Sequence, residues 1–221
     1  MEQALGTLLP IGVAAALSSV PITAVILILL SDKRSHSALP FLLGWVFGTL
    51  LLVSVGTIAA SSIPKPRPRH ADTTTGVLEI LLGAALVALS LRAMLHRRAA
   101  GAGQSSRWTK AISSLGPVKS LGVGLALNLR PKGLILSATA SLALHSAKLG
   151  VRESAILVVL YTAVATSTVA IPVVATLASP HRMEPRLIEA RDWLDEHGYV
   201  VTATITLLIG VIILGAGIAK L

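Results

Sequence analysis

Two basic side chains, Arg130 and Lys132, stand inside an apolar stretch of the chain. Lys132 comes about twelve residues into that stretch, or about 18 Å along a helix, which is near the middle of a bilayer. A charge at that depth costs at least about 2.5–3.5 kcal/mol, so these side chains must face water, a counter-charge or an anionic ligand. The structural alternative is a side chain that snorkels to the membrane surface, which requires a position near a helix end.

Glu79 is the one acidic residue inside the apolar stretches. It is a candidate counter-charge for Lys132 or a candidate proton-coupling group. The alternative is a residue at headgroup level that stabilises the N-terminus of its helix. One acid against two bases leaves a positive site, which favours a cargo with a carboxylate, sulfate or phosphate group. The same balance argues against a carrier of metal cations, which would need several inward carboxylates, so no metal ligand and no cofactor is predicted.

Prolines with polar neighbours interrupt two of the apolar stretches near their middle, at Ser18-Ser19-Val20-Pro21 and at Asn128-Leu129-Arg130-Pro131-Lys132. A proline removes one backbone donor, so the carbonyls and half-helix ends around it need polar partners. Paired breaks of this kind are typical of the cargo site of a membrane carrier, whereas a single one is an ordinary kink. The predicted substrate-binding residues are Ser18, Ser19, Pro21, Asn128, Arg130, Pro131, Lys132 and Thr166, the last from a polar stripe in residues 154–178.

Six apolar stretches must position these residues. The chain has 221 residues, 53% of them hydrophobic and 13% charged, whereas about 25% of the residues of a soluble domain are charged. Each stretch reaches the length of about 20 residues that a helix needs to cross a bilayer. The stretches are residues 4–30, 38–63, 76–95, 121–147, 154–178 and 199–219. The predicted fold is therefore an all-α integral membrane protein, with residues 1–221 as one transmembrane domain.

The stretches fall into two halves, residues 4–95 and 120–221, joined by a Gly- and Ser-containing linker over residues 96–119. Three helices in each half are an odd number, so the second half must be inverted relative to the first. The broken stretches then become helices 1 and 4 of two inverted three-helix repeats. Within the second half, apolar side chains recur at helical spacing in residues 185–197, and charged side chains take the other face. This pattern predicts a short amphipathic helix in the membrane interface.

The loops predict the orientation. With both termini outside, the inner loops and helix ends hold eleven Lys and Arg residues and the outer ones hold six. The excess of positive charge on cytoplasmic loops then places the N and C termini on the outer side of the cytoplasmic membrane.

Several function classes are excluded by what the sequence lacks. There is no cysteine, which excludes disulfide scaffolds and thiol redox chemistry. There is no Gly-x-Ser-x-Gly elbow, phosphate loop or His-Glu-x-x-His motif, so no enzyme activity is predicted. The net charge of +9 accompanies only seven aromatic residues, and the basic residues lie between apolar stretches. This pattern favours the anchoring of membrane loops over nucleic-acid binding.

Short elements spread over nearly the whole chain carry a family resemblance. They are Leu9-Pro10, Ala16-Leu17-Ser18-Ser19-Val20-Pro21, Leu29-Leu30-Ser31, Phe41-Leu42-Leu43-Gly44-Trp45-Val46-Phe47-Gly48, Arg130-Pro131-Lys132-Gly133-Leu134 and Arg191-Asp192-Trp193-Leu194. In this order they resemble the Sap/GAP family of actinobacteria, the sulfolipid- and peptidoglycolipid-addressing proteins of the lysine-exporter superfamily. That superfamily usually has Asn-Pro-Lys in its fourth helix, and here Arg130 takes the Asn place while Asn128 stands two residues earlier. The resemblance implies six helices in two inverted repeats and a role in exporting or addressing cell-envelope glycolipids.

Three functions remain open on the sequence. The chain is a transporter of an anionic lipid, an exporter of small solutes such as amino acids, or a non-transporting scaffold in a larger lipid-export machine. A lipid carrier needs a lateral opening between helices, whereas a solute exporter needs a closed polar cavity. The expected partners are membrane lipids, an anionic lipid or small-molecule cargo, a larger lipid-export machine and a second copy of the chain.

Overall fold

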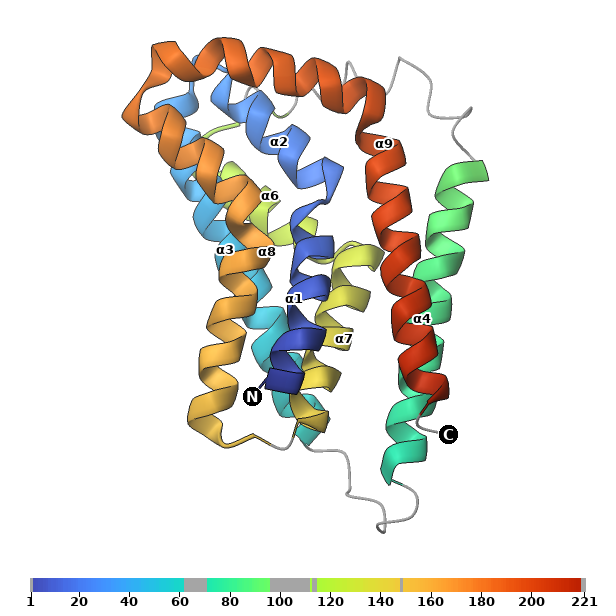
Figure 1. The fold of residues 1–221 in the computed structure, drawn as a ribbon. Helices are drawn as coiled ribbons and strands as arrows, with labels where there is room; N and C mark the ends of the chain where they lie inside the picture. The colour runs from blue at the N-terminus through green and yellow to red at the C-terminus, as the bar shows by residue number, and fades with distance from the viewer. Residues whose placement is uncertain (1, 62–70, 96–111, 113–114, 148, 220–221) are drawn as a thin grey trace.

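The computed structural model describes residues 2–61, 71–95, 112, 115–147 and 149–219, and the secondary structure of these residues is helical (Figure 1). The helices of the first half are α1 (Glu2–Ala16), α2 (Ser19–Leu29), α3 (Arg34–Ser61) and α4 (Ala71–Leu95). Those of the second half are α6 (Pro117–Asn128), α7 (Pro131–Ser146), α8 (Val151–Ala178) and α9 (Pro180–Ile218). The predicted all-α class is confirmed, while most of the predicted linker, residues 96–111 and 113–114, lies outside the described residues.

Four helical segments are long and apolar enough to cross a membrane. They are Arg34–Ala60, Thr75–Leu95, Val151–Ala178 and Val200–Ile218. Ala4–Ala16 and Ser19–Leu29 form a fifth candidate if this bent pair counts as one span. These segments make the chain an integral membrane protein. The remaining predicted stretch, residues 121–147, is divided between α6 and α7, whose 12 and 16 residues are each shorter than a bilayer crossing.

The chain is broken at both places where proline predicts a break. Between α1 and α2, Leu17 and Ser18 leave the helix and the axis bends by 49°. Between α6 and α7, Arg130 is extended, with φ −67° and ψ 150°, and Pro131 begins the next helix. The residue before a proline is disfavoured in the helical region because the proline ring clashes with it, which accounts for the second break.

The amphipathic segment 185–197 is not a separate helix. It belongs to the 39-residue α9, which runs across one end of the bundle and then turns to pass along it (Figure 1). The predicted division of its faces is confirmed, because Leu187 is buried and Leu194 packs on the same cluster, whereas Glu189 and Asp192 are exposed. No proline follows Pro185 within α9, so the chain stays helical into the last membrane segment.

Close helix contacts pack the two halves against each other. α3 lies along α6 and α7, and α4 lies along α9. A Cβ added at Gly44 of α3 would run into the Leu121 carbonyl of α6, so this contact requires a residue without a side chain. Residues far apart in the sequence also meet as an ion pair: the Arg34 guanidinium at the start of α3 lies 3.6 Å from Glu184 Oε2 of α9.

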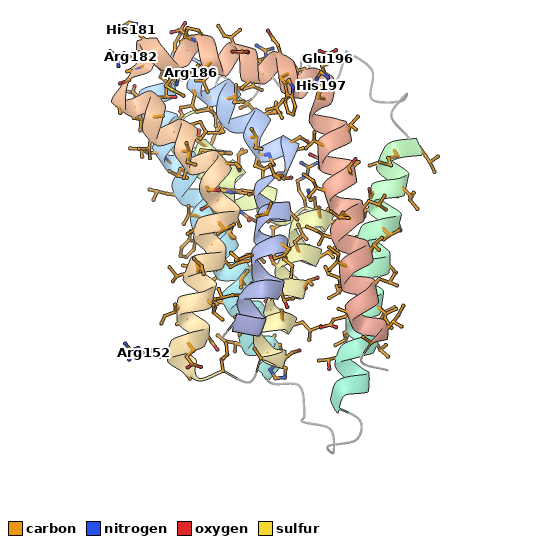
Figure 2. All side chains as sticks on the ribbon, viewed as in Figure 1. Arg152, His181, Arg182, Arg186, Glu196 and His197 are labelled. Atoms are coloured by element: carbon orange, nitrogen blue, oxygen red, sulfur yellow. The ribbon has the colours of Figure 1, made fainter. Side chains whose placement is uncertain are left out.

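The path of the chain places basic residues at opposite ends of the helix bundle. α1 begins and α9 ends at the same end of the bundle (Figure 1). Arg182 and Arg186 lie at the other end, and Arg152 lies far from them (Figure 2). The segment with Arg182 and Arg186 and the segment with Arg152 can therefore lie on opposite sides of a membrane, as the predicted topology requires. Which side is outside stays a prediction.

Candidate functional site

A cavity of about 350 Å³ lies where the two helix breaks meet. Seven of the eight predicted substrate-binding residues line it: Ser18, Ser19, Pro21, Asn128, Arg130, Pro131 and Lys132. Segments from opposite halves of the sequence therefore share one site. Thr166 is buried and is not among the described lining residues, and its hydroxyl donates to the Thr162 carbonyl of its own helix at 2.8 Å.

Threonines of α8 and α9 hold the first break. Pro21 has no N–H, so it cannot donate the helical hydrogen bond that the Leu17 carbonyl would accept. Thr202 of α9 takes that place, since its hydroxyl donates to the Leu17 carbonyl at 3.3 Å and accepts from the Ser19 N–H at 3.2 Å. The hydroxyl of Thr168 in α8 donates to the Ala16 carbonyl at 2.7 Å. The polar backbone groups exposed by the break thus find partners in the second half of the chain.

Asn128 fastens the second break to α3. Its Nδ2 donates to the carbonyls of Gly124 at 3.1 Å and Trp45 at 3.3 Å. Its Oδ1 accepts from the Thr49 hydroxyl at 2.9 Å. Both amide protons are used, so the Asn128 side chain positions the break in this structure. Its contact with a cargo stays a prediction.

The two basic residues differ in their surroundings. Arg130 lines the cavity and is exposed. The physical cause is the extended backbone before Pro131, which takes this residue out of the helix. Lys132 is largely buried, and within the described part of the chain its Nζ has no hydrogen-bond partner. A buried group of this kind calls for a partner that the protein itself does not supply.

Glu79 is not the partner of Lys132 in this structure. It is buried in α4 and is not one of the described residues that line the cavity. Ser90 of the same helix does line it, and eleven residues separate the two, or about 16 Å along the helix axis. No carboxylate is found among the described lining residues, so the cavity carries positive charge only. A proton-coupling role of Glu79 stays a prediction.

Several lining residues were not singled out from the sequence as cargo contacts. They are Trp45, Thr49, Ser90, Ser137, Tyr161, Thr202 and Thr206. Thr202 and Thr206 stand four residues apart on one face of the last apolar stretch, and that spacing is the signal that could have indicated a polar wall. The structure contains no cluster of three possible metal ligands in the part of the chain that it describes.

The family model of Sap, sulfolipid-1-addressing protein, matches residues 8–219. The match covers nearly the whole chain, including both helix breaks and every described residue that lines the cavity. No curated protein and no solved structure matches the chain.

Proposed function

The chain belongs to the Sap, or sulfolipid-1-addressing protein, family, and on this basis we propose that it moves an anionic cell-envelope lipid across the cytoplasmic membrane. One observation carries the proposal. Both helix breaks open onto a single cavity that has two cationic side chains and, among its described lining residues, no acidic one. The description of the family names an addressing role, and the cavity supplies a place where a headgroup would be held.

The proposal takes the broken pairs α1–α2 and α6–α7 as one crossing each. Together with the four intact segments they make six crossings. An even number is supported by the position of the chain ends, because α1 begins and α9 ends at the same end of the bundle (Figure 1). In this architecture both breaks lie inside the bilayer, where exposed backbone is tolerated only if it lines a cavity or is buried in protein.

The way each break is held supports two inverted repeats. The first break, in the first half, is held by Thr168 and Thr202 of the second half. The second break, in the second half, is held by Thr49 and the Trp45 carbonyl of the first half. Such an exchange of partners is what a pseudo-two-fold relation between the halves would produce, with the cargo site at their interface.

The charges favour an anionic headgroup. Arg130, exposed at the rim, offers a planar fork that binds a sulfate or phosphate at two points. Lys132, deeper in the wall, adds a point charge whose desolvation an anionic ligand would offset. A volume of about 350 Å³ is near the lower limit of ordinary ligand pockets, so it suits a headgroup whose acyl chains remain in the bilayer.

The test is the transbilayer movement of a labelled lipid. Purified protein is reconstituted in phosphatidylcholine vesicles that carry a trace of acyl-labelled phosphatidylglycerol or acyl-labelled phosphatidylcholine. A membrane-impermeant quencher then reports how fast label from the inner leaflet reaches the outer one, with and without a pH gradient. We expect the protein to speed the movement of phosphatidylglycerol well beyond that of phosphatidylcholine.

Two outcomes would contradict the proposal. Movement no faster than in protein-free vesicles, in either gradient condition, would favour the scaffold function. Release of entrapped labelled amino acids without any lipid movement would favour the solute exporter.

A further inference from the structure

Trp45 of α3 has a buried polar group that the site described so far does not use. The residue is 7% exposed and lines the cavity. Its indole Nε1 is buried and lacks a hydrogen-bond partner among the residues that the structure describes. An indole N–H can only donate, so the group needs an acceptor from outside the described protein atoms.

The backbone of Trp45 is held in place at the second break. Its carbonyl accepts from Asn128 Nδ2 at 3.3 Å, and it shares the single proton of the Thr49 hydroxyl, at 2.9 Å, with Asn128 Oδ1. A Cβ added at Gly124 of α6 would lie 2.9 Å from the Trp45 backbone nitrogen, which shows how closely the two helices pack there. The backbone position of Trp45 is therefore set by the same contacts that set the break.

Lys132 supplies a second unsatisfied donor in the wall of the same cavity. An indole N–H and an ammonium group are both donors without acceptor capacity. Two such groups fit a ligand that offers oxygens alone, as a phosphate or sulfate ester does. We infer that Trp45 is a specificity-determining residue, whose N–H binds an oxygen of the anionic headgroup beside Lys132. This inference rests on the proposed function in one respect, since it takes the cavity as the cargo site.

The positive charge of the cavity also disfavours lipids with zwitterionic headgroups. A choline or ethanolamine headgroup would bring its own cation towards Arg130 and Lys132. No carboxylate from the described lining residues is there to receive it. Selectivity would thus combine two donors for the ester oxygens with repulsion of a zwitterionic headgroup.

The first experiment measures Trp45 itself. The chain has three tryptophans, so the double variant W108F/W193F leaves Trp45 as the one indole. Its emission is followed in detergent while dihexanoyl phosphatidylglycerol, dihexanoyl phosphatidylcholine or glycerol 3-phosphate is added. We expect a saturable change with phosphatidylglycerol at a concentration at least about ten-fold below that of phosphatidylcholine, and loss of the change when K132M is added. A change with glycerol 3-phosphate alone at similar concentrations would identify the free anion, rather than the lipid, as the source of the headgroup chemistry.

The second experiment removes the donor. Trp45→Phe keeps an aromatic ring and loses the N–H, and Trp193→Phe is the matched control because Trp193 is half exposed on α9 and is not among the described lining residues. Binding of acyl-labelled phosphatidylglycerol is measured by fluorescence anisotropy. We expect Trp45→Phe to weaken it about ten-fold, with phosphatidylcholine binding unchanged, since a hydrogen bond to a charged group is lost.

Unchanged Trp45 emission in the first experiment, or equal phosphatidylglycerol affinity of Trp45→Phe and the native chain, would overturn the inference. The emission experiment leaves residue 45 intact, so it decides the matter even if Trp45→Phe does not fold. The failures are distinguishable, because binding without lipid movement would contradict the proposed function alone. Lipid movement with a silent Trp45 would contradict the inference alone.

Discussion

At the scale of single residues, Lys132 places a charged group without a described partner in the wall of the cavity. Its ammonium is buried, and hydrogen-bond partners are lacking for it in the described ranges. A buried charge without a partner lowers stability, so a chain selected for stability alone would have an apolar side chain here. A lysine at this position is explained if its ammonium group binds an anionic ligand.

The substitution Lys132→Met tests this use. Methionine keeps much of the length and removes the charge, so we expect the free energy of unfolding to rise by about 1–3 kcal/mol while movement of labelled phosphatidylglycerol is lost. The matched control is Lys119→Met at the exposed start of α6, which should change stability by less than about 0.5 kcal/mol and leave transport intact. A lower melting temperature of Lys132→Met with undiminished transport per folded molecule would instead assign Lys132 a structural role.

Two glycines give a second residue-scale prediction. A Cβ added at Gly48 would lie 2.6 Å from Asn128 Nδ2, whereas one added at Gly122 meets no atom within 4 Å. We expect Gly48→Ala to displace the Asn128 amide and to lower the free energy of unfolding by about 1–3 kcal/mol. Gly122→Ala should be neutral or stabilising by up to about 1 kcal/mol, because alanine is the better helix former. Thermal unfolding in one detergent compares them, and equal effects would mean that the Gly48–Asn128 contact is unimportant.

At the scale of the elements, the broken helices are held by side chains of the opposite half. Thr202 is central to this arrangement because a single hydroxyl serves both a donor and an acceptor at the α1–α2 break. A displacement of α9 away from that break would lengthen these two hydrogen bonds. The break and the last helix are therefore linked directly, and both line the same cavity.

Thr202→Val removes both hydrogen bonds and keeps the shape of the side chain. We expect a loss of about 1–3 kcal/mol in the free energy of unfolding, since the Ser19 N–H and the Leu17 carbonyl lose their partner. Thr204→Val on the exposed face of the same helix is the control and should stay within about 0.5 kcal/mol of the native chain. Chemical denaturation gives both values. Indistinguishable values for the two variants would mean that Thr202 does not brace the break.

At the scale of the whole molecule, the arrangement of the chain predicts its sidedness. Glu153 and Ser179 lie at opposite ends of α8, both exposed, and the chain has no cysteine that would contribute background. With both termini outside, we expect Glu153→Cys to react with an impermeant thiol reagent on intact cells and Ser179→Cys to be protected until the membrane is opened. The reverse labelling pattern would show that the loop charges were assigned to the wrong sides.

The membrane character, the helical class and the two breaks were predictable from the sequence, because each depends on local chemistry. An apolar helix of about 20 residues is long enough to cross the hydrocarbon core of a bilayer, and a proline lacks its N–H whatever surrounds it. Thr166 shows the limit of this reasoning. Thr166 and Thr206 both bond their own helix, yet only Thr206 is among the described lining residues, and the sequence pattern is the same in both cases.

Only the tertiary structure decided which distant groups complete the site. Thr202 bridges the first break and Trp45 joins the second, although neither stands out in an apolar stretch. The part of α4 that lines the cavity, around Ser90 and away from Glu79, was likewise decided by how the helices pack together. The physical reason is that proline chemistry creates unpaired backbone groups locally, whereas the partners that satisfy them are chosen by helix packing between the two halves of the chain.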